Sequence, residues 1–115
     1  MQYLLMIYDN ESEEVKNPAL LQEITAAHMR LGAELTQSGA LVSGQRLRPS
    51  ETATTIRTDA AGAQSLHDGP YAETREQLAG FYMIEAPDLD AAIAWGKKIP
   101  GAPGHAIEVR PIWPM

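Results

Sequence analysis

Cysteine is absent from this sequence of 115 residues, which excludes disulfides, thiolate catalysis and zinc-thiolate sites. Long apolar runs are absent too, because the longest, "YLLMIY" near the N-terminus, falls far short of the roughly 20 residues that a membrane-spanning helix needs. The N-terminus also lacks the basic start and the cleavage pattern of a secretory signal. We therefore expect a cytoplasmic protein that does not enter a membrane.

Basic residues are few, with nine Lys and Arg against fifteen Asp and Glu and a net charge of −6. They are scattered apart from the pair Lys97-Lys98, whereas nucleic-acid-binding proteins concentrate them in a patch that neutralises phosphates. Direct binding of DNA or RNA is therefore disfavoured. The apolar fraction of 44% is typical of an ordinary globular protein, and the length fits a single domain over residues 1–115.

Two helices are predicted from capping residues and the 3.6-residue apolar period. The first begins at Asn17-Pro18, where Asn caps free amides and Pro suits the first helical position, and ends at Gly39. The second is capped by Asp88 and ended by Pro100-Gly101. Apolar or alternating runs predict strands at 2–8, 41–47, 53–58, 63–67, 80–86 and 106–112, and the acidic stretch 9–16 is interpreted as a surface loop.

The two short runs at 53–58 and 63–67 form a hairpin, and removing it leaves two βαβ units in tandem. This is the signature of a ferredoxin-like α+β fold, βαββαβ, with an inserted β-hairpin. Right-handed crossovers place both helices on the same face of one antiparallel sheet. The opposite face then needs cover from the inserted hairpin, a second subunit or both, and we expect a homodimer packed through it.

The stretch "DGPYAETREQLAGFYMIEAPDLDAAIAW", followed by "IEVRPI", closely resembles the YCII-related family in its DGPF-domain branch. That branch carries Asp-Gly-Pro-Phe-Ala-Glu-Thr-Lys-Glu, a Gly-aromatic strand, an Asp-initiated helix and a closing Glu-Val-Arg-Pro strand. Tyr71 replaces the usual Phe here and Arg75 the usual Lys. The segments "SGALVSGQRLRP" and "TIRT" also fit, so the similarity runs nearly from end to end.

The resemblance implies a dimeric α+β barrel, the paired form of the ferredoxin-like fold. It implies less about activity, because the biochemical role of the family is largely unassigned. YCII-like proteins are discussed as enzymes with an Asp and a His in a cleft. DGPF members are linked by gene neighbourhood to extracytoplasmic-function sigma factors.

The motif Asp68-Gly69-Pro70 has a structural and a functional interpretation. A turn uses Asp to accept backbone hydrogen bonds, Gly for unusual dihedrals and Pro to set the direction of exit. The same rigid turn could instead aim the Asp68 carboxylate into a pocket, as a catalytic base or as an anchor for substrate. Glu73 is a second catalytic candidate, since on a helical turn it would share one side with Glu76, although such charges are commonly solvated.

Arg46, Arg110 and Tyr82 lie in predicted strands and are candidates for substrate binding. Alternation separates Arg110 and Glu108 from the apolar positions of the last strand, so they are expected to face away from the helices. An arginine there could clamp a carboxylate with two hydrogen bonds, or form a structural salt bridge between strands or subunits.

His28 falls inside the apolar arc of the first helix. Histidines there usually pack in the core or at its edge, and a catalytic role is the alternative. His67 and Asp68 alternate across a strand, His105 is isolated, and no histidine pair has the spacing of a helical metal site, so neither metal nor cofactor is expected.

Two hypotheses of function remain. In the first, a cleft in the dimer binds or processes a small polar or acidic organic ligand by acid-base chemistry without a cofactor. In the second, the protein is a non-catalytic partner module tied to sigma-factor regulation. A buried pocket that holds Asp68 with an arginine would favour the first hypothesis, and a filled cleft the second.

Overall fold

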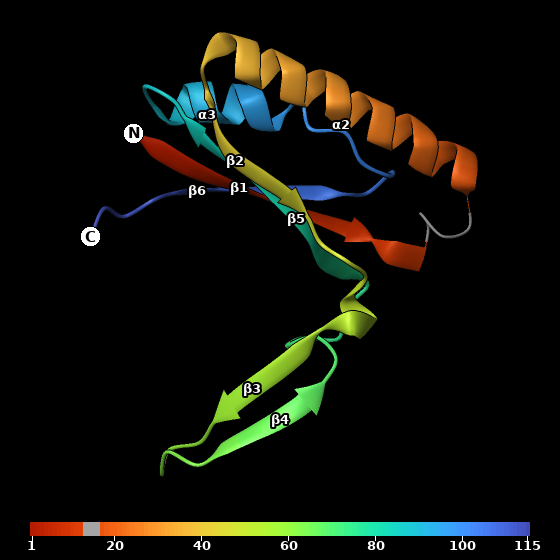
Figure 1. Ribbon diagram of the computed structural model, residues 1–115, viewed down its shortest axis with the longest axis vertical. Coiled ribbons are helices and arrows are strands. Elements are labelled where there is room, and N and C mark those ends of the chain that lie inside the picture. The colour runs from red at the N-terminus through yellow and green to blue at the C-terminus, as the bar shows by residue number, and fades with distance from the viewer. Residues whose placement is uncertain (13–16) are drawn as a thin grey trace.

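The computed structural model describes residues 1–12 and 17–115. In them, a four-stranded sheet carries two helices on one face, and a two-stranded hairpin extends from one end (Figure 1). In chain order the elements are β1 (Gln2–Asn10), α2 (Pro18–Ser38), β2 (Leu41–Arg46), the 3-10 turn η1 (Ser50–Thr52), β3 (Thr54–Thr58), β4 (Gln64–Asp68), β5 (Glu76–Glu85), α3 (Leu89–Gly96) and β6 (Ala106–Pro111).

The sheet order is β2-β5-β1-β6, and every neighbouring pair is antiparallel. This order, with both helices on one face, confirms the predicted ferredoxin-like α+β fold with an inserted hairpin. The pairing of β1 with β5 extends from Gln2 opposite Glu85 to Asn10 opposite Glu76, so both strands run further into polar sequence than expected. Neither helix combines the length and the hydropathy needed to cross a lipid bilayer, as far as the described residues go.

The side chains of β1 alternate between the two faces of the sheet. Tyr3, Leu5 and Ile7 point toward the helices and are buried, as is Ile84, which pairs with Tyr3 from the neighbouring β5. These residues form one core cluster with the buried side of α2. The core therefore lies between the sheet and its two helices.

The ends of both helices follow the predicted capping residues. Asn17 accepts a hydrogen bond from the backbone N–H of Leu20, and Gly39 closes α2 with a φ of 79°. Asp88 caps α3 by accepting from the N–H of Ala91. α3 ends at Gly96, earlier than predicted, and its buried residues pack on the sheet beside β6.

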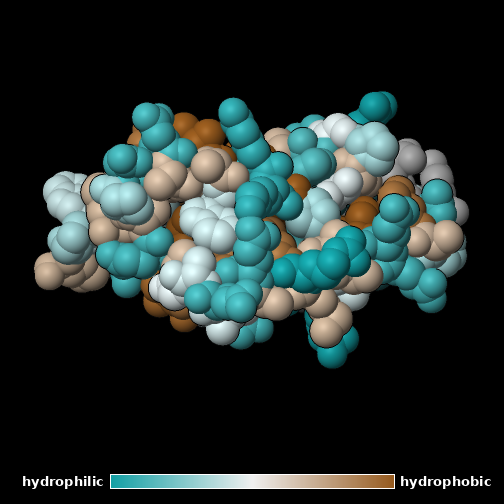
Figure 2. Space-filling model, turned by 90° about the horizontal axis from the view of Figure 1, so that it is seen from above, coloured by the Kyte–Doolittle hydropathy of each residue, from teal (hydrophilic) through white to brown (hydrophobic). Residues whose placement is uncertain are grey.

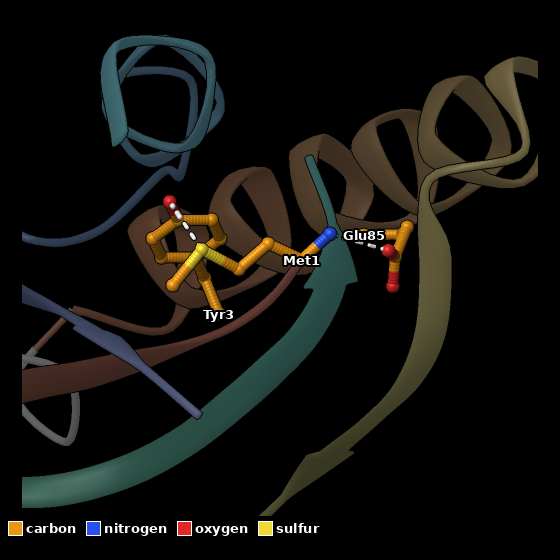
Figure 3. Close-up of polar contacts among 3 residues, drawn as sticks. All are labelled: Met1, Tyr3 and Glu85. Atoms are coloured by element: carbon orange, nitrogen blue, oxygen red, sulfur yellow. Dashed lines mark hydrogen bonds and ion pairs between the residues drawn. The ribbon is translucent and has the colours of Figure 1, made fainter. Parts of the chain in front are cut away.

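The start of β1 is tied to the end of β5 (Figure 3). The terminal amine of Met1 lies 2.6 Å from the Glu85 carboxylate, and the Tyr3 hydroxyl donates to the Met1 sulfur at 3.5 Å. Both charged groups are about half exposed, so this ion pair adds little to the free energy of unfolding. The N–H of Ala86 also donates to the Met1 carbonyl at 2.9 Å, which fixes the register at this end of the sheet.

The face of the sheet opposite the helices is apolar along its two central strands, β1 and β5, and we call this face the open face. Register places six side chains from β1 and β5 on it: Leu4, Met6, Tyr8, Leu78, Phe81 and Met83. The side over the helices is different, since hydrophilic side chains dominate it and hydrophobic residues show only in patches (Figure 2). The hairpin does not lie over the open face, because β3 and β4 pair with each other and extend away from the sheet (Figure 1).

Candidate functional site

A cavity of about 700 Å³ lies between α2 and the β2–β5 side of the sheet, and we call it the helix-side cavity. Its volume is in the range of sites for small organic ligands, about 300–1,000 Å³. Apolar groups of α2 and β1 form much of its wall. The polar and charged residues that line it are Asp9, Glu11, Thr25, His28, Gln45, Arg46, Arg48 and Tyr82.

A histidine and a tyrosine are hydrogen-bonded inside this cavity. The Nδ1 atom of His28 lies 2.7 Å from the Tyr82 hydroxyl, and the two rings stack with their centroids 5.8 Å apart. His28 follows Ile24 by one turn of α2, so the apolar period brings it to the sheet. Tyr82 pairs with Leu5 and lies on the same helix-facing side of the sheet. The fold thus joins two of the predicted site residues.

Both members of the pair are held in their neutral forms. Burial lowers the pKa of His28 and the positive charge of Arg46 lowers it further, whereas the backbone carbonyl of Pro100 and the charge of Asp9 act in the opposite direction without reversing the shift. Burial raises the pKa of Tyr82. Near pH 7 the imidazole can therefore accept a proton and the phenol can donate one.

The contact between His28 and Tyr82 fits one tautomer of the neutral imidazole. A neutral imidazole has a single N–H, and a phenol hydroxyl can donate. When that N–H is on Nε2, Nδ1 accepts the hydroxyl proton of Tyr82.

Gly44 makes room for the tyrosine ring. It lies opposite Tyr82 in the pairing of β2 with β5. A Cβ atom at this position would come within 3.0 Å of the Tyr82 Cδ1 atom and 3.3 Å of the Phe81 carbonyl oxygen. The glycine therefore lets the phenol lie flat against β2, beside the cavity.

Asp9 is a member of the site that sequence reasoning missed. The predicted surface loop from residue 9 is wrong at this position, because Asp9 pairs with Gln77 inside β1 and is only 3% exposed. Continuing the alternation Tyr3, Leu5, Ile7 by one step would have placed it on the buried face. Residues 13–16 of that predicted loop lie outside the described residues.

Arg46 and Arg48 supply positive charge at the edge of the cavity. Arg46 pairs with Gly80 on the helix-facing side of the sheet, and both arginines are exposed. Neither forms an ion pair with a carboxylate within residues 1–12 and 17–115. Their guanidinium groups can therefore meet the carboxylate or phosphate of a ligand with paired hydrogen bonds.

Arg110, the other predicted substrate-binding arginine, is not brought to this cavity. It lies on the open face, opposite Leu4 of β1, as alternation predicted. Its guanidinium pairs with Glu108 two residues earlier on the same strand. That arrangement is a salt bridge within β6, on the far side of the sheet from His28.

Asp68 and Glu73 are exposed, and neither lines the helix-side cavity. The turn that the motif predicted is present: Gly69 has a φ of 118°, and its N–H donates to the Ala53 carbonyl at 2.8 Å. The helical turn expected to align Glu73 with Glu76 is absent, because Glu76 already begins β5. The motif therefore closes the base of the hairpin, and the catalytic role of both carboxylates stays a prediction.

A second cavity of about 530 Å³ lies at the base of the hairpin. Pro70, Tyr71 and Ala72 of the motif line it together with Tyr8 and Leu78 of the open face. Its wall is largely apolar. No cluster of three His, Asp or Glu side chains suited to a metal ion occurs in either cavity or elsewhere in the described part of the chain.

The comparisons with known proteins point to one family. The model of the YCII-related domain matches residues 1–115. This chain belongs to the YCII-related family. A relative from Rhizobium meliloti (strain 1021), itself described as an uncharacterized protein, is 31% identical over 119 residues, which cover 97% of this chain and 92% of the relative. The predicted family is confirmed, and its DGPF branch stays a prediction.

Proposed function

We propose that this YCII-related protein binds a small organic anion in the helix-side cavity and exchanges a proton with it without a cofactor. The observation that carries the proposal is the 2.7 Å contact between His28 and Tyr82 inside a cavity edged by Arg46. Arg46 forms no ion pair with a carboxylate within the described residues, so its guanidinium can bind the anionic end of the ligand. A neutral imidazole suits proton transfer near pH 7.

The proton can move along the pair in one direction. Because Nδ1 of His28 faces the hydroxyl, the group that meets the ligand is the oxygen of Tyr82. As this oxygen takes a proton from an acidic O–H or C–H of the ligand, its own proton passes to Nδ1. The resulting imidazolium is stabilised by the nearby charge of Asp9 and by the Pro100 carbonyl.

The first experiment separates binding from proton transfer. Small organic acids are screened for a rise in Tm, and exchange of ligand hydrogen for deuterium is followed by NMR for those that bind. Arg46→Gln should abolish the rise in Tm. Tyr82→Phe should keep it and slow the exchange by about 10²–10⁴-fold, because only the hydroxyl is lost.

Tyr71→Phe is the matched control, since Tyr71 is exposed and does not line the helix-side cavity. It should leave both the rise in Tm and the exchange unchanged. Tyr82→Phe with normal exchange would contradict the proton-transfer role. An unchanged response to ligand in Arg46→Gln would contradict the anion site.

Asp68 and Glu73 are tested with the same screen. Asp68→Asn keeps the shape of the turn and removes the charge. A lost ligand response at unchanged Tm would add Asp68 to the site. A lower Tm with an intact ligand response would leave it as a turn residue.

The alternative is a non-catalytic partner module in sigma-factor-linked regulation. In that case the cavity has no small ligand, and no organic acid in the screen should raise the Tm. The large exposed side chains of the hairpin and the apolar open face are the features that suit a partner module.

We also propose that the working form is a homodimer whose subunits meet through the open face. The support is physical: six large apolar side chains lie on one side of the sheet, and no described element of the chain covers them. Burying an apolar surface of this kind in an interface lowers the free energy of the assembly.

A further inference from the structure

The hairpin of β3 and β4, residues 54–68, is an arm with two large aliphatic side chains in water. Ile56 and Leu66 pair across the strands and are 63% and 75% exposed. Thr55 is the sole half-buried residue of the two strands. The arm extends beyond the sheet on the side away from the helices, where the open face lies (Figure 1).

The base of the arm is firmly built. The hydroxyl of Thr55 donates to the Gly69 carbonyl at 2.8 Å, and the guanidinium of Arg57 lies 5.0 Å from the ring centroid of Tyr71. Before the arm, the Glu11 carboxylate accepts from the N–H and the hydroxyl of Ser50 at 2.7 and 2.6 Å. These contacts fix the direction of the arm while its apolar pair faces solvent.

A two-stranded hairpin on its own is marginally stable in water. Ile56 and Leu66 have no apolar neighbours on their face of the arm, because the residues beside them are Thr54, Thr58, Gln64 and Asp68. The pair is therefore suited to packing against another surface, and that surface must lie beyond the sheet of its own chain.

The position of the open face indicates which surface this is. The arm and the open face lie on the same side of the sheet, away from the helices (Figure 1). A second copy on the open face also lies within reach of an arm about 17 Å long.

We propose that the arm of each protomer packs against the second copy, with Ile56 and Leu66 buried between them, and that the two arms complete an interface begun by the open faces. The contact is reciprocal, because a dimer with two-fold symmetry places both arms alike. This inference rests on the homodimer proposed above. It adds a specific structural role for the inserted hairpin.

Removal of the apolar pair tests the arm. Ile56→Thr combined with Leu66→Thr keeps residues that favour strands and removes the aliphatic surface. The dimer dissociation constant, measured by sedimentation over a dilution series, should rise at least tenfold. Met29→Thr is the matched control, because Met29 is 73% exposed on α2 on the helix side of the molecule, and it should leave the constant unchanged.

Hydrogen exchange of the wild-type chain provides an independent measurement. Amides of residues 54–68 should be more protected above the dissociation constant than below it. A wild-type chain that stays monomeric at all concentrations would overturn the homodimer and the arm contact together. A wild-type dimer with unprotected arm amides and an unchanged constant in the double variant would overturn the arm contact alone, and would leave the arm free for a different partner.

Discussion

The position of His28 follows from a local sequence pattern, whereas its contact with Tyr82 does not. The helical period placed His28 on the buried side of α2, where packing was the favoured interpretation and a catalytic role the alternative. Its hydrogen bond to Tyr82 spans 54 positions of the chain and is decided by how α2 lies across β5. The proposed proton transfer rests on that pair.

The lowered pKa of His28 has a consequence for stability against pH. The unfolded chain binds a proton on His28 near pH 6.5, and the folded chain does so only at lower pH. The unfolded state therefore binds more protons between these two pKa values, so stability is fully present above about 6.5 and is lost as the pH falls below it.

We expect the Tm of the wild type, measured by calorimetry, to fall as the pH is lowered below about 6.5. His28→Asn should flatten that part of the curve. His67→Asn, at an exposed site on β4, should keep it. Equal pH dependence in the wild type and in His28→Asn would show that the histidine is not the titrating group.

At the scale of elements, the loop between α3 and β6 supports the site from behind. It carries Pro100, whose backbone carbonyl favours the protonated form of His28 and so raises its pKa. The next residue, Gly101, lies against the ring of His105, and a Cβ atom there would come within 2.5 Å of its Cγ atom. His105 is itself held by a 3.0 Å contact between Nδ1 and the Ala102 carbonyl. Because the ring is held in place, a side chain larger than that of glycine at position 101 would clash with it.

Gly101→Ala should therefore lower the free energy of unfolding by about 1–3 kcal/mol through overpacking. In the background of His105→Ala, the same change should cost much less, since the ring that it strikes is gone. Urea denaturation of the four proteins in this cycle measures the coupling. Additive effects would mean that the two residues do not press on each other.

Gly32→Ala is the control for the glycine substitution. Gly32 lies in the interior of α2, and a Cβ atom there meets no heavy atom within 4 Å. Alanine favours a helix over glycine by roughly 0.5–1 kcal/mol, so this variant should be more stable than the wild type.

At the scale of the whole molecule, one face of the sheet is covered by helices and the opposite face is not covered by them. The helices bury the face that carries Leu5 and Ile84, and the open face presents Met6 and Phe81 side by side across β1 and β5. A charge in the middle of the open face should be tolerated by a monomer, where water can reach it, and should oppose a dimer that buries it.

Met6→Lys should therefore convert the proposed dimer to a monomer that keeps its circular dichroism spectrum. Light scattering across a concentration series measures this change. Leu89→Lys, at a half-exposed position on α3, is the control and should stay dimeric. A wild type that is already monomeric at micromolar concentration would contradict the dimer.

Some features of this protein were determined by local sequence. Asn17, Gly39 and Asp88 set helix ends through hydrogen bonds and dihedrals that depend on near neighbours, and strand alternation placed Arg110 on the open face. The order of strands and helices, with the right-handed crossover rule, was enough for the ferredoxin-like fold. The long motif that begins with Asp-Gly-Pro was sufficient to identify the family.

Other features were decided only by tertiary structure. Asp9 is buried because the pairing of β1 with β5 continues past the apolar run, and such pairing depends on residues far along the chain. Arg46 joins His28 and Tyr82 because β2 lies beside β5 at the edge of the helix-covered face, whereas the hairpin carries Asp68 away from that face. Contacts between distant segments follow from packing and register, and these are properties of the assembled sheet.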